Sequence, residues 1–302
     1  MTDISNPSLH QDWSGIKSEL RQNGFYRLQA FEANEVAYLN TLCSKYLGTA
    51  QSDFVSSSHI LDWEDSAFIN QEIHKILKDK MEKMLPDLEL LGGTLATKIK
   101  GKSPLNAHKD WTIVDESKFN SYNLWIPLVD TDKNNGTLGL WPGSHLWNEQ
   151  PRGFSIPDPY DQFTEKIIPI GFEPKLKAGE AILYNHKLLH YSRPNRTDQP
   201  RNVAIIGMKD KEATLQVSIY DQHKINTYAV SEADFYRFDA VKIMVDKPLI
   251  NAIDQKNIHS QWNEIYQDYI DHLPTNYKYL INNGKPFTNI WKKLKAAFNL
   301  TN

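Results

Sequence analysis

The chain has 302 residues, of which 40% are hydrophobic and 24% charged, and its formal net charge is −3 at pH 7. This length and composition suit a globular protein with a substantial core. We expect a single domain over residues 1–302, because barrels and sandwiches with added helices often reach this size. The near-neutral charge argues against a nucleic-acid partner, since such proteins carry a basic surface. No apolar run approaches the length that crosses a bilayer, so we expect no integral membrane segment.

Cys43 is the only cysteine, which excludes an internal disulfide and a metal site built from several thiolates. It lies in an apolar helical pattern, where a buried, unreactive thiol is the expectation. The first residues, Met1–Pro7, lack the basic and apolar regions of a signal peptide. We therefore expect a cytoplasmic protein in a reducing compartment.

The first part of the chain, residues 1–87, has a helical pattern. Its expected elements are helices at 12–22, 32–47 and 67–85, a short strand at 24–28 and a polar loop at 49–59. The third helix has the clearest pattern, because its apolar positions recur every 3.6 residues until Pro86. We expect that apolar stripe to pack into the core.

Residues 88–222 consist of short alternating runs separated by turn signals such as Asn135-Gly136 and Pro142-Gly143. The expected strands are 93–99, 105–112, 122–129, 137–141, 166–170, 174–176, 181–185, 188–192, 203–208 and 214–220. Short strands at this spacing are typical of a β-sandwich or jelly roll. The core is therefore expected to be mainly β, with helices flanking it.

Two further segments surround or interrupt this core. Residues 148–165 form an insertion rich in proline and polar groups, which fits either an active-site lid or a plain surface loop. Residues 223–302 are expected to form a helical extension with helices at 257–273 and 287–298. The last helix is amphipathic and basic, and it suits docking on the core or a subunit partner better than a membrane surface.

His108 and Asp110 lie in the expected strand 105–112, where alternate side chains share a face. An imidazole and a carboxylate in this arrangement supply two of the three ligands of a 2-His-1-carboxylate site. Such a site holds Fe(II) and leaves other coordination positions open. The pair alone occurs by chance in many chains, so the prediction depends on residues about eighty positions downstream.

His186 and His190 compete for the third ligand position. Residues 194–200 have the composition of a hairpin connection, which would place Arg201 opposite His190. A guanidinium there can bind the far carboxylate of a dicarboxylate whose near end chelates the metal. Ser192, on the same face as His190, can add a hydroxyl. We therefore predict His190 as the ligand and His186 as its neighbour.

Several motifs together resemble the phytanoyl-CoA dioxygenase (PhyH-like) family of Fe(II)/2-oxoglutarate-dependent oxygenases. They are His108-x-Asp110, the run Gly136–His145, Gly179-Glu180-Ala181, and His190-x-Ser192-x-x-Asn195 followed by Arg201. The resemblance spans about residues 24–208. It implies a double-stranded β-helix (jelly-roll, cupin-like) core and bound Fe(II). It also implies hydroxylation of a small-molecule substrate, with 2-oxoglutarate and O2 converted to succinate and CO2.

The resemblance also assigns roles by position. The residues that match the family's iron ligands are His108, Asp110 and His190. The residues that match its co-substrate contacts are Arg201, Ser192 and Trp125. A further basic or polar contact falls on either Lys98 or Lys100. An intact Asp110 favours hydroxylation, because halogenases of this kind lack the carboxylate.

Other residues have two interpretations. His145 is expected to be a structural turn residue. Asp115-Glu116 fits a solvated turn, or else a pocket mouth that receives a cationic or hydroxylated substrate. Arg152, Phe154 and Tyr160 of the insertion are candidate substrate contacts.

Two other functional classes stay open at this point. One is a jelly-roll binding protein without turnover, and the other is a zinc or manganese hydrolase that uses the same three ligands. Nothing in the sequence resembles a coenzyme A site, so the family name does not identify the substrate. The oligomeric state is also open.

Overall fold

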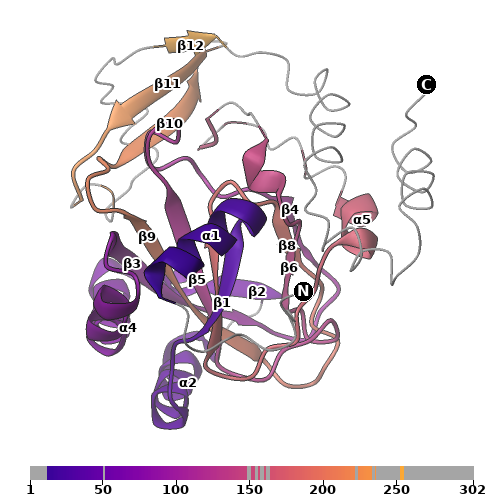
Figure 1. Ribbon diagram of the computed structural model, residues 1–302. Coiled ribbons are helices and arrows are strands. Elements are labelled where there is room, and N and C mark those ends of the chain that lie inside the picture. The colour runs from indigo at the N-terminus through magenta and orange to yellow at the C-terminus, as the bar shows by residue number, and fades with distance from the viewer. Residues whose placement is uncertain are drawn as a thin grey trace.

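The structure is a computed structural model, shown in Figure 1. It describes residues 12–49, 52–147, 151–153, 156, 160, 164–221, 224–232, 235 and 252–254. The helices expected at 257–273 and 287–298, and Phe154, lie outside these ranges. No helix among the described residues combines the length and the apolar character needed to cross a bilayer.

The N-terminal helices and first strand are confirmed. They are α1 (Trp13–Asn23), β1 (Phe25–Gln29), α2 (Ala33–Leu47) and α4 (Trp63–Met84). Asp12 caps the start of α1 and Asp62 that of α4, through side-chain bonds to backbone N–H groups. Gly24, with φ of 82°, ends α1 and starts the turn into β1.

The polar loop expected at 49–59 was wrong over its second half. That stretch forms β2 (Phe54–Ser56) and the short helix α3 (Ser57–Ile60). The serine hydroxyls are bound within the protein, since Ser57 Oγ lies 2.7 Å from Thr94 Oγ1 and accepts from the Leu95 N–H at 3.1 Å. The serines of this stretch therefore form hydrogen bonds to the neighbouring strand β3 (Leu88–Lys98).

The core strands build two antiparallel sheets. The strands are β3 (Leu88–Lys98), β4 (Leu105–His108), β5 (Ser121–Pro127), β6 (Leu138–Leu140), β7 (Glu180–Asn185), β8 (His190–Ser192) and β9 (Arg201–Asp210). The larger sheet has the order β1-β7-β5-β9-β3-β2, and the smaller sheet has the order β4-β8-β6. With the flanking helices, this arrangement confirms the expected jelly-roll core.

Two expected strands were wrong. Residues 166–170 lie in the helix α5 (Thr164–Ile167) and the 3-10 helix η3 (Ile168–Ile170), and 174–176 makes only an isolated bridge from Leu176 to Thr131. Pro169 and Pro174 have no N–H for a strand ladder, which disfavours a strand at both places.

Alternating side chains of the larger sheet enter two different cores. Leu124 and Ile126 of β5 face α2 and α4, whereas Trp125 between them faces the smaller sheet and packs with Leu140 and Tyr191. Figure 1 shows these helices on one side of the larger sheet and β4, β8 and β6 on the other. The space between the two sheets holds the candidate site.

The C-terminal prediction was wrong in part. Residues 223–302 were expected to be helical, but β11 (Lys224–Ala229) pairs with both β10 (Gln216–Asp221) and β12 (Ala252–Asp254) in a third sheet. β11 contains Ile225, Thr227 and Tyr228, which are residue types that favour strands. The single domain over 1–302 stays a prediction, since residues 255–302 lie outside the described ranges.

Candidate metal and co-substrate site

His108, Asp110 and His190 converge on one point between the sheets. The two histidines are direct cross-strand partners in the β4–β8 pair, with ring centroids 4.2 Å apart. Asp110 Oδ1 lies 4.0 Å from His108 Nε2 and 3.7 Å from His190 Nε2. One ligand atom from each residue fits in a group whose members all lie within 4.8 Å of one another.

Asp110 reaches this point differently from the prediction. β4 ends at His108, so Asp110 does not share a strand face with it and lies in the irregular segment that follows. The segment is held in place by Arg152, whose Nε donates to the Asp110 carbonyl at 2.7 Å.

Both imidazoles are oriented by backbone carbonyls. His108 Nδ1 lies 2.6 Å from the Asn106 oxygen, and His190 Nδ1 lies 2.9 Å from the Leu188 oxygen. A carbonyl only accepts hydrogen bonds, so Nδ1 carries the proton in the neutral form of each ring and Nε2 then keeps a lone pair. The two lone pairs belong to the nitrogens that face Asp110, as metal ligation requires.

The charge states also suit a metal. Burial would raise the pKa of Asp110, but His190, His186, His108 and the Asn123 hydrogen bond together lower it to about 2. Burial lowers the pKa of His190 to about 4, so this ring is neutral near pH 7. A charged carboxylate beside a neutral imidazole is the state in which both groups bind a divalent ion.

Asn123 is a site residue that sequence analysis missed. Its Nδ2 donates to Asp110 Oδ2 at 2.9 Å, which leaves Oδ1 directed at the histidines. Asn123 precedes Trp125 by two positions on β5, so the two side chains share a face. Strand parity with the predicted Trp125 was the signal that could have found it.

The predicted hairpin between His190 and Arg201 was wrong. β8 belongs to the smaller sheet and β9 to the larger one, so Arg201 pairs with Lys98 and His190 with His108. Residues 193–200 are a crossover between the sheets. Asn195, fully buried, holds the crossover by donating to the Lys98 carbonyl at 2.9 Å. The composition of residues 194–200 correctly predicted a connection between strands, but the two strands belong to different sheets.

Arg201 is nevertheless buried between the sheets, with its guanidinium carbon 5.5 Å from the ring centroid of Trp125. Its strand partner Lys98 is also fully buried and donates to Ser192 Oγ at 2.7 Å. Lys100 instead pairs with Asp198 at the surface. Of the two lysines left open by the sequence, the geometry selects Lys98 and joins it to Ser192 and Arg201.

Lys98 and Arg201 are two buried basic groups on neighbouring strands. Within the described part of the chain neither forms an ion pair, and Arg201 Nε has no hydrogen-bond partner. Burial, with a contribution from Arg201, lowers the pKa of Lys98 to about 7 against a smaller opposing effect of the Asp53 carboxylate, and burial lowers that of Arg201 to about 10. Two buried basic groups without an ion-pair partner among the described residues form a site for an anion.

The anion site, formed by Lys98, Arg201 and Ser192, lies close to the triad of His108, Asp110 and His190. Ser192 follows His190 by two residues on β8, so both side chains leave the same face, roughly 7 Å apart along the strand. That spacing suits a short dicarboxylate with one end at the histidines and the other at Lys98 and Arg201. The residues therefore fit both a divalent metal and a chelating co-substrate.

His186 and His145 are not part of the group of three. His186 is buried near Asp110, and neither ring nitrogen hydrogen-bonds to any described residue. His145 is buried with Nε2 3.0 Å from the Arg21 carbonyl, and burial lowers its pKa to about 4. His145 is thus structural, as expected, and His186 is a neighbour of the site.

The solvated turn was wrong for Glu116. Arg152 binds the Glu116 carboxylate through two nitrogens, at 2.6 and 3.1 Å, so this carboxylate is paired within the protein. The alternative, a pocket mouth that receives a cationic or hydroxylated substrate, stays a prediction. Asp115 does bond at the surface, to Lys118. Tyr160, the other described residue weighed as a substrate contact, is fully buried in the core between the sheets.

The chain matches the profile of the phytanoyl-CoA dioxygenase (PhyH) family over residues 21–203. It belongs to this family. The match covers the two sheets except for β9 beyond residue 203, and it includes all three converging residues and the anion site. It confirms the resemblance drawn from the sequence. β10, β11 and β12 lie beyond it.

Two curated relatives are named as dioxygenases. Dioxygenase FUM3 of Gibberella moniliformis is 26% identical over 134 residues, which cover 42% of this chain and 40% of that protein. Dioxygenase trt7 of Aspergillus terreus is 32% identical over 101 residues, or 31% of each chain. The chain thus spans less than half the length of either relative.

The fold has solved counterparts. The non-heme alpha ketoglutarate dependent carbocyclase SnoK from nogalamycin biosynthesis superposes with a TM-score of 0.54 over 83% of this chain and 97% of its own, at 14% identity. At this identity the likeness establishes the jelly-roll fold, and the site must be argued from its own residues.

Proposed function

We propose that the protein is an Fe(II)/2-oxoglutarate-dependent dioxygenase that hydroxylates an unactivated C–H bond of a small molecule. In this reaction 2-oxoglutarate and O2 become succinate and CO2. The observation that carries the proposal is the convergence of His108, Asp110 and His190 within 4.8 Å, beside a buried anion site. Membership of the family supports the same reaction class.

In this proposal the three converging residues are the iron ligands. Bound Fe(II) would supply the oxygen chemistry, because two imidazoles and one carboxylate leave three coordination positions open. The protein presents the ligands in their binding states: the carbonyls of Asn106 and Leu188 fix the imidazole tautomers, and Asn123 turns the carboxylate. Preset ligands lower the cost of ordering the site when the ion binds.

Arg201, Lys98 and Ser192 are proposed to hold the far carboxylate of 2-oxoglutarate. The Arg201 guanidinium can donate hydrogen bonds to that carboxylate. The Lys98 amine donates to the Ser192 hydroxyl and to the Ser192 and Arg193 carbonyls, so its part would be to add positive charge beside the carboxylate. Trp125 packs beside the guanidinium and limits the directions in which Arg201 can point. The co-substrate would thereby be held with its keto acid end toward the histidines.

The anion site favours this function over the two alternatives. A hydrolase that uses the same triad with zinc or manganese has no need for two buried basic groups, without an ion-pair partner among the described residues, about one co-substrate length from the metal. A binding protein without turnover has no need for three preset ligands with their metal-facing atoms directed at one point. Succinate formation that requires both Fe(II) and O2 would exclude both.

The experiment is anaerobic addition of Fe(II) and 2-oxoglutarate to the purified chain, followed by visible absorption. We expect the weak charge-transfer band of the chelated co-substrate. The band should be lost in His190→Ala and much weakened in Arg201→Ala, but unchanged in Lys100→Ala, because Lys100 pairs with Asp198 at the surface. A band of full strength in both site variants would overturn the proposal.

A further inference from the structure

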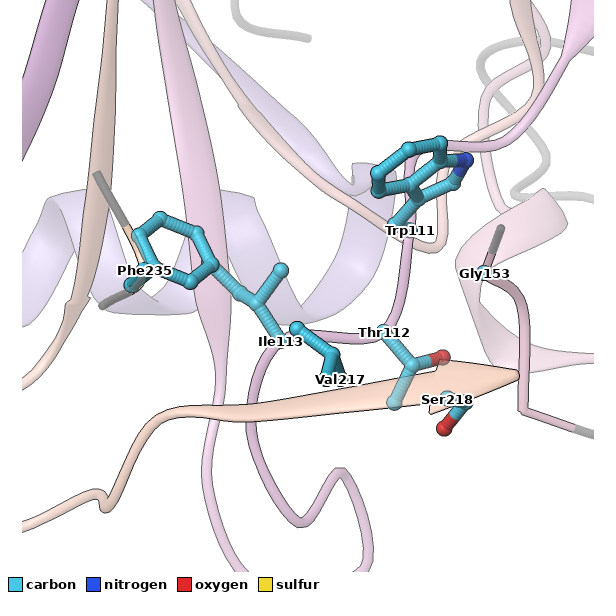
Figure 2. Close-up of a pocket in the computed structure, with 7 residues that line it drawn as sticks. All are labelled: Trp111, Thr112, Ile113, Gly153, Val217, Ser218 and Phe235. Carbon is cyan, nitrogen blue, oxygen red and sulfur yellow. The ribbon is translucent and has the colours of Figure 1, made fainter. Parts of the chain in front are cut away.

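A partly enclosed pocket of about 120 Å³ lies next to the segment that carries Asp110. Figure 2 shows the rings of Trp111 and Phe235 on two sides of it, with Ile113 and Val217 between them. Val217 belongs to β10, so the third sheet provides one wall. The pocket thus joins the site segment to a part of the chain beyond the family match.

The pocket has an apolar character, because its polar side chains already have partners. Thr112 Oγ1 accepts a hydrogen bond from the Arg152 N–H at 3.0 Å. Ser218 Oγ lies 3.0 Å from Thr227 Oγ1. The remaining side chains are aromatic or aliphatic, so a ligand here would gain by burying hydrocarbon.

The pocket wall is rigidly connected to the metal site. Thr112 follows Asp110 by two residues, which places their Cα atoms at most about 7 Å apart. The Thr112 N–H donates to the Arg152 carbonyl at 3.0 Å, and Arg152 Nε donates to the Asp110 carbonyl at 2.7 Å. The bidentate bond to Glu116 fixes the same arginine from the other side. A group in the pocket would therefore keep a constant position relative to Asp110.

The backbone closes the pocket at Gly153. This residue lies so close to the Ser218 carbonyl that a Cβ would overlap it. Gly153 and strand β10 are therefore in direct contact. The pocket is bounded on this side by main chain and has a defined size.

We propose that this pocket binds a compact apolar group of the small molecule that the enzyme oxidises, with roughly four to six carbon atoms. The size follows from the volume, since a dry apolar cavity of about 150 Å³ accepts benzene. The group is branched or cyclic, because a long chain would not fit. The oxidised C–H lies on the adjoining part of the molecule, nearer Asp110. This inference rests on the proposed function, because only an enzyme of that class makes the bound molecule a substrate. Binding of an apolar group in the pocket can be tested separately.

The test uses the full chain labelled with 5-fluorotryptophan and loaded anaerobically with Fe(II) and 2-oxoglutarate. The Trp111 resonance is assigned by its loss in Trp111→Phe. Benzene and cyclohexanol serve as compact probes and n-decanol as the long one. We expect a saturable shift of the Trp111 resonance with both compact probes, and at least tenfold weaker binding of n-decanol.

Variants at Val217 test the location. Val217→Phe fills the pocket and should weaken compact-probe binding at least tenfold. Val217→Ala enlarges it and should retain that binding and admit larger rings. Ala229→Phe, which adds an equal ring at an exposed position of the neighbouring strand β11, should leave binding unchanged. If Val217→Phe does not fold, Val217→Ala still tests the location of the pocket. Binding of larger rings by this variant would support it, and an unchanged preference for probe size would contradict it.

An unmoved Trp111 resonance up to the solubility limit of the compact probes would overturn the inference. So would equal probe binding in Val217→Phe and the wild type. The Fe(II)/2-oxoglutarate absorption band is read in the same samples. Its absence from the wild type would count against the proposed function, whereas a normal band without probe binding would count against the pocket alone.

Discussion

At the residue scale, the site depends on groups that hold the ligands as much as on the ligands themselves. His108 and His190 each give up Nδ1 to a backbone carbonyl, and Asp110 gives up Oδ2 to Asn123. Since only Nε2 and Oδ1 remain, the three residues have one shared direction in which to bind. Removing a side chain that hydrogen-bonds to a ligand, such as the Asn123 amide, should therefore weaken metal binding although all three ligands remain.

Asn123→Ala tests this. We expect Fe(II) affinity to fall by about 10- to 100-fold, because Asp110 loses the bond that directs its free oxygen. The measurement is an anaerobic Fe(II) titration. Asn202→Ala is the matched control, since Asn202 lies in the same sheet but bonds to Asn40 and Thr97 on the helical side. Equal losses in the two variants would show that Asn123 acts only through general stability.

Lys98 predicts how co-substrate binding depends on pH. Burial holds its pKa at about 7 in the free site, so the amine is increasingly neutral above pH 7. A bound carboxylate favours the charged form and raises that pKa. Affinity for 2-oxoglutarate should thus be highest below pH 7. It should fall by up to about tenfold per pH unit above it, because each binding event must take up a proton.

The absorption band, titrated with 2-oxoglutarate from pH 6 to pH 9, measures this dependence. In Lys98→Met the affinity should be lower and its fall above pH 7 should disappear. Lys100→Met should behave like the wild type. A wild-type affinity that does not change between pH 6 and pH 9 would contradict the role given to Lys98.

The choice between Lys98 and Lys100 shows why the sequence alone could not identify the buried lysine. The two residues differ by two positions, so in a continued strand they would share a face, and parity could not separate them. β3 ends at Lys98, and Lys100 lies beyond it and reaches the surface. The end of that strand is set by tertiary contacts, which no local pattern records.

At the element scale, the crossover of residues 193–200 determines the anion site. It carries the chain from the strand of His190 to the strand of Arg201, and so from one sheet to the other. The prolines and polar residues of this segment indicate a turn but do not say which strands it connects. A hairpin and a crossover have the same local composition. The predicted pairing of Arg201 with His190 was therefore wrong, whereas the roles of the two residues stay proposals.

Asn195→Ala should destabilise this element. The buried amide donates to the carbonyls of Lys98 and Gln199, and the loss of both bonds should cost about 1–3 kcal/mol in urea unfolding. Affinity for 2-oxoglutarate should also fall, because Lys98 and Arg201 are both attached to this crossover. Arg196→Ala, at an exposed neighbouring position, should change neither quantity. A stable variant with unchanged affinity would refute this view of the crossover.

At the scale of the whole molecule, alternation and turn signals were enough to predict the jelly-roll core, since alternate residues of the larger sheet enter two different cores. Of the third sheet, only β10 was predicted, as the strand 214–220. Its strand β12 pairs with β11 across more than twenty residues, and both strands lie in the part of the chain that was expected to be helical. Pairing partners at such distances decide between strand and helix where local preference is weak.

The molecule thus has two regions on either side of Asp110. The sheets that match the family hold the three converging residues and the anion site, whereas the third sheet helps to wall the apolar pocket beside Asp110. On this account the first region defines the reaction and the second selects the molecule that undergoes it. Both depend on a metal ion at the point where the first region's side chains meet.

The most direct measurement is therefore the number of Fe(II) ions bound per chain, determined by anaerobic titration of the wild type and of the variants His108→Ala, Asp110→Ala and His190→Ala. The account predicts one ion per chain in the wild type and strongly weakened binding in every variant, with the fold of each variant retained by circular dichroism. Unchanged binding of one ion in folded variants of all three residues would contradict it.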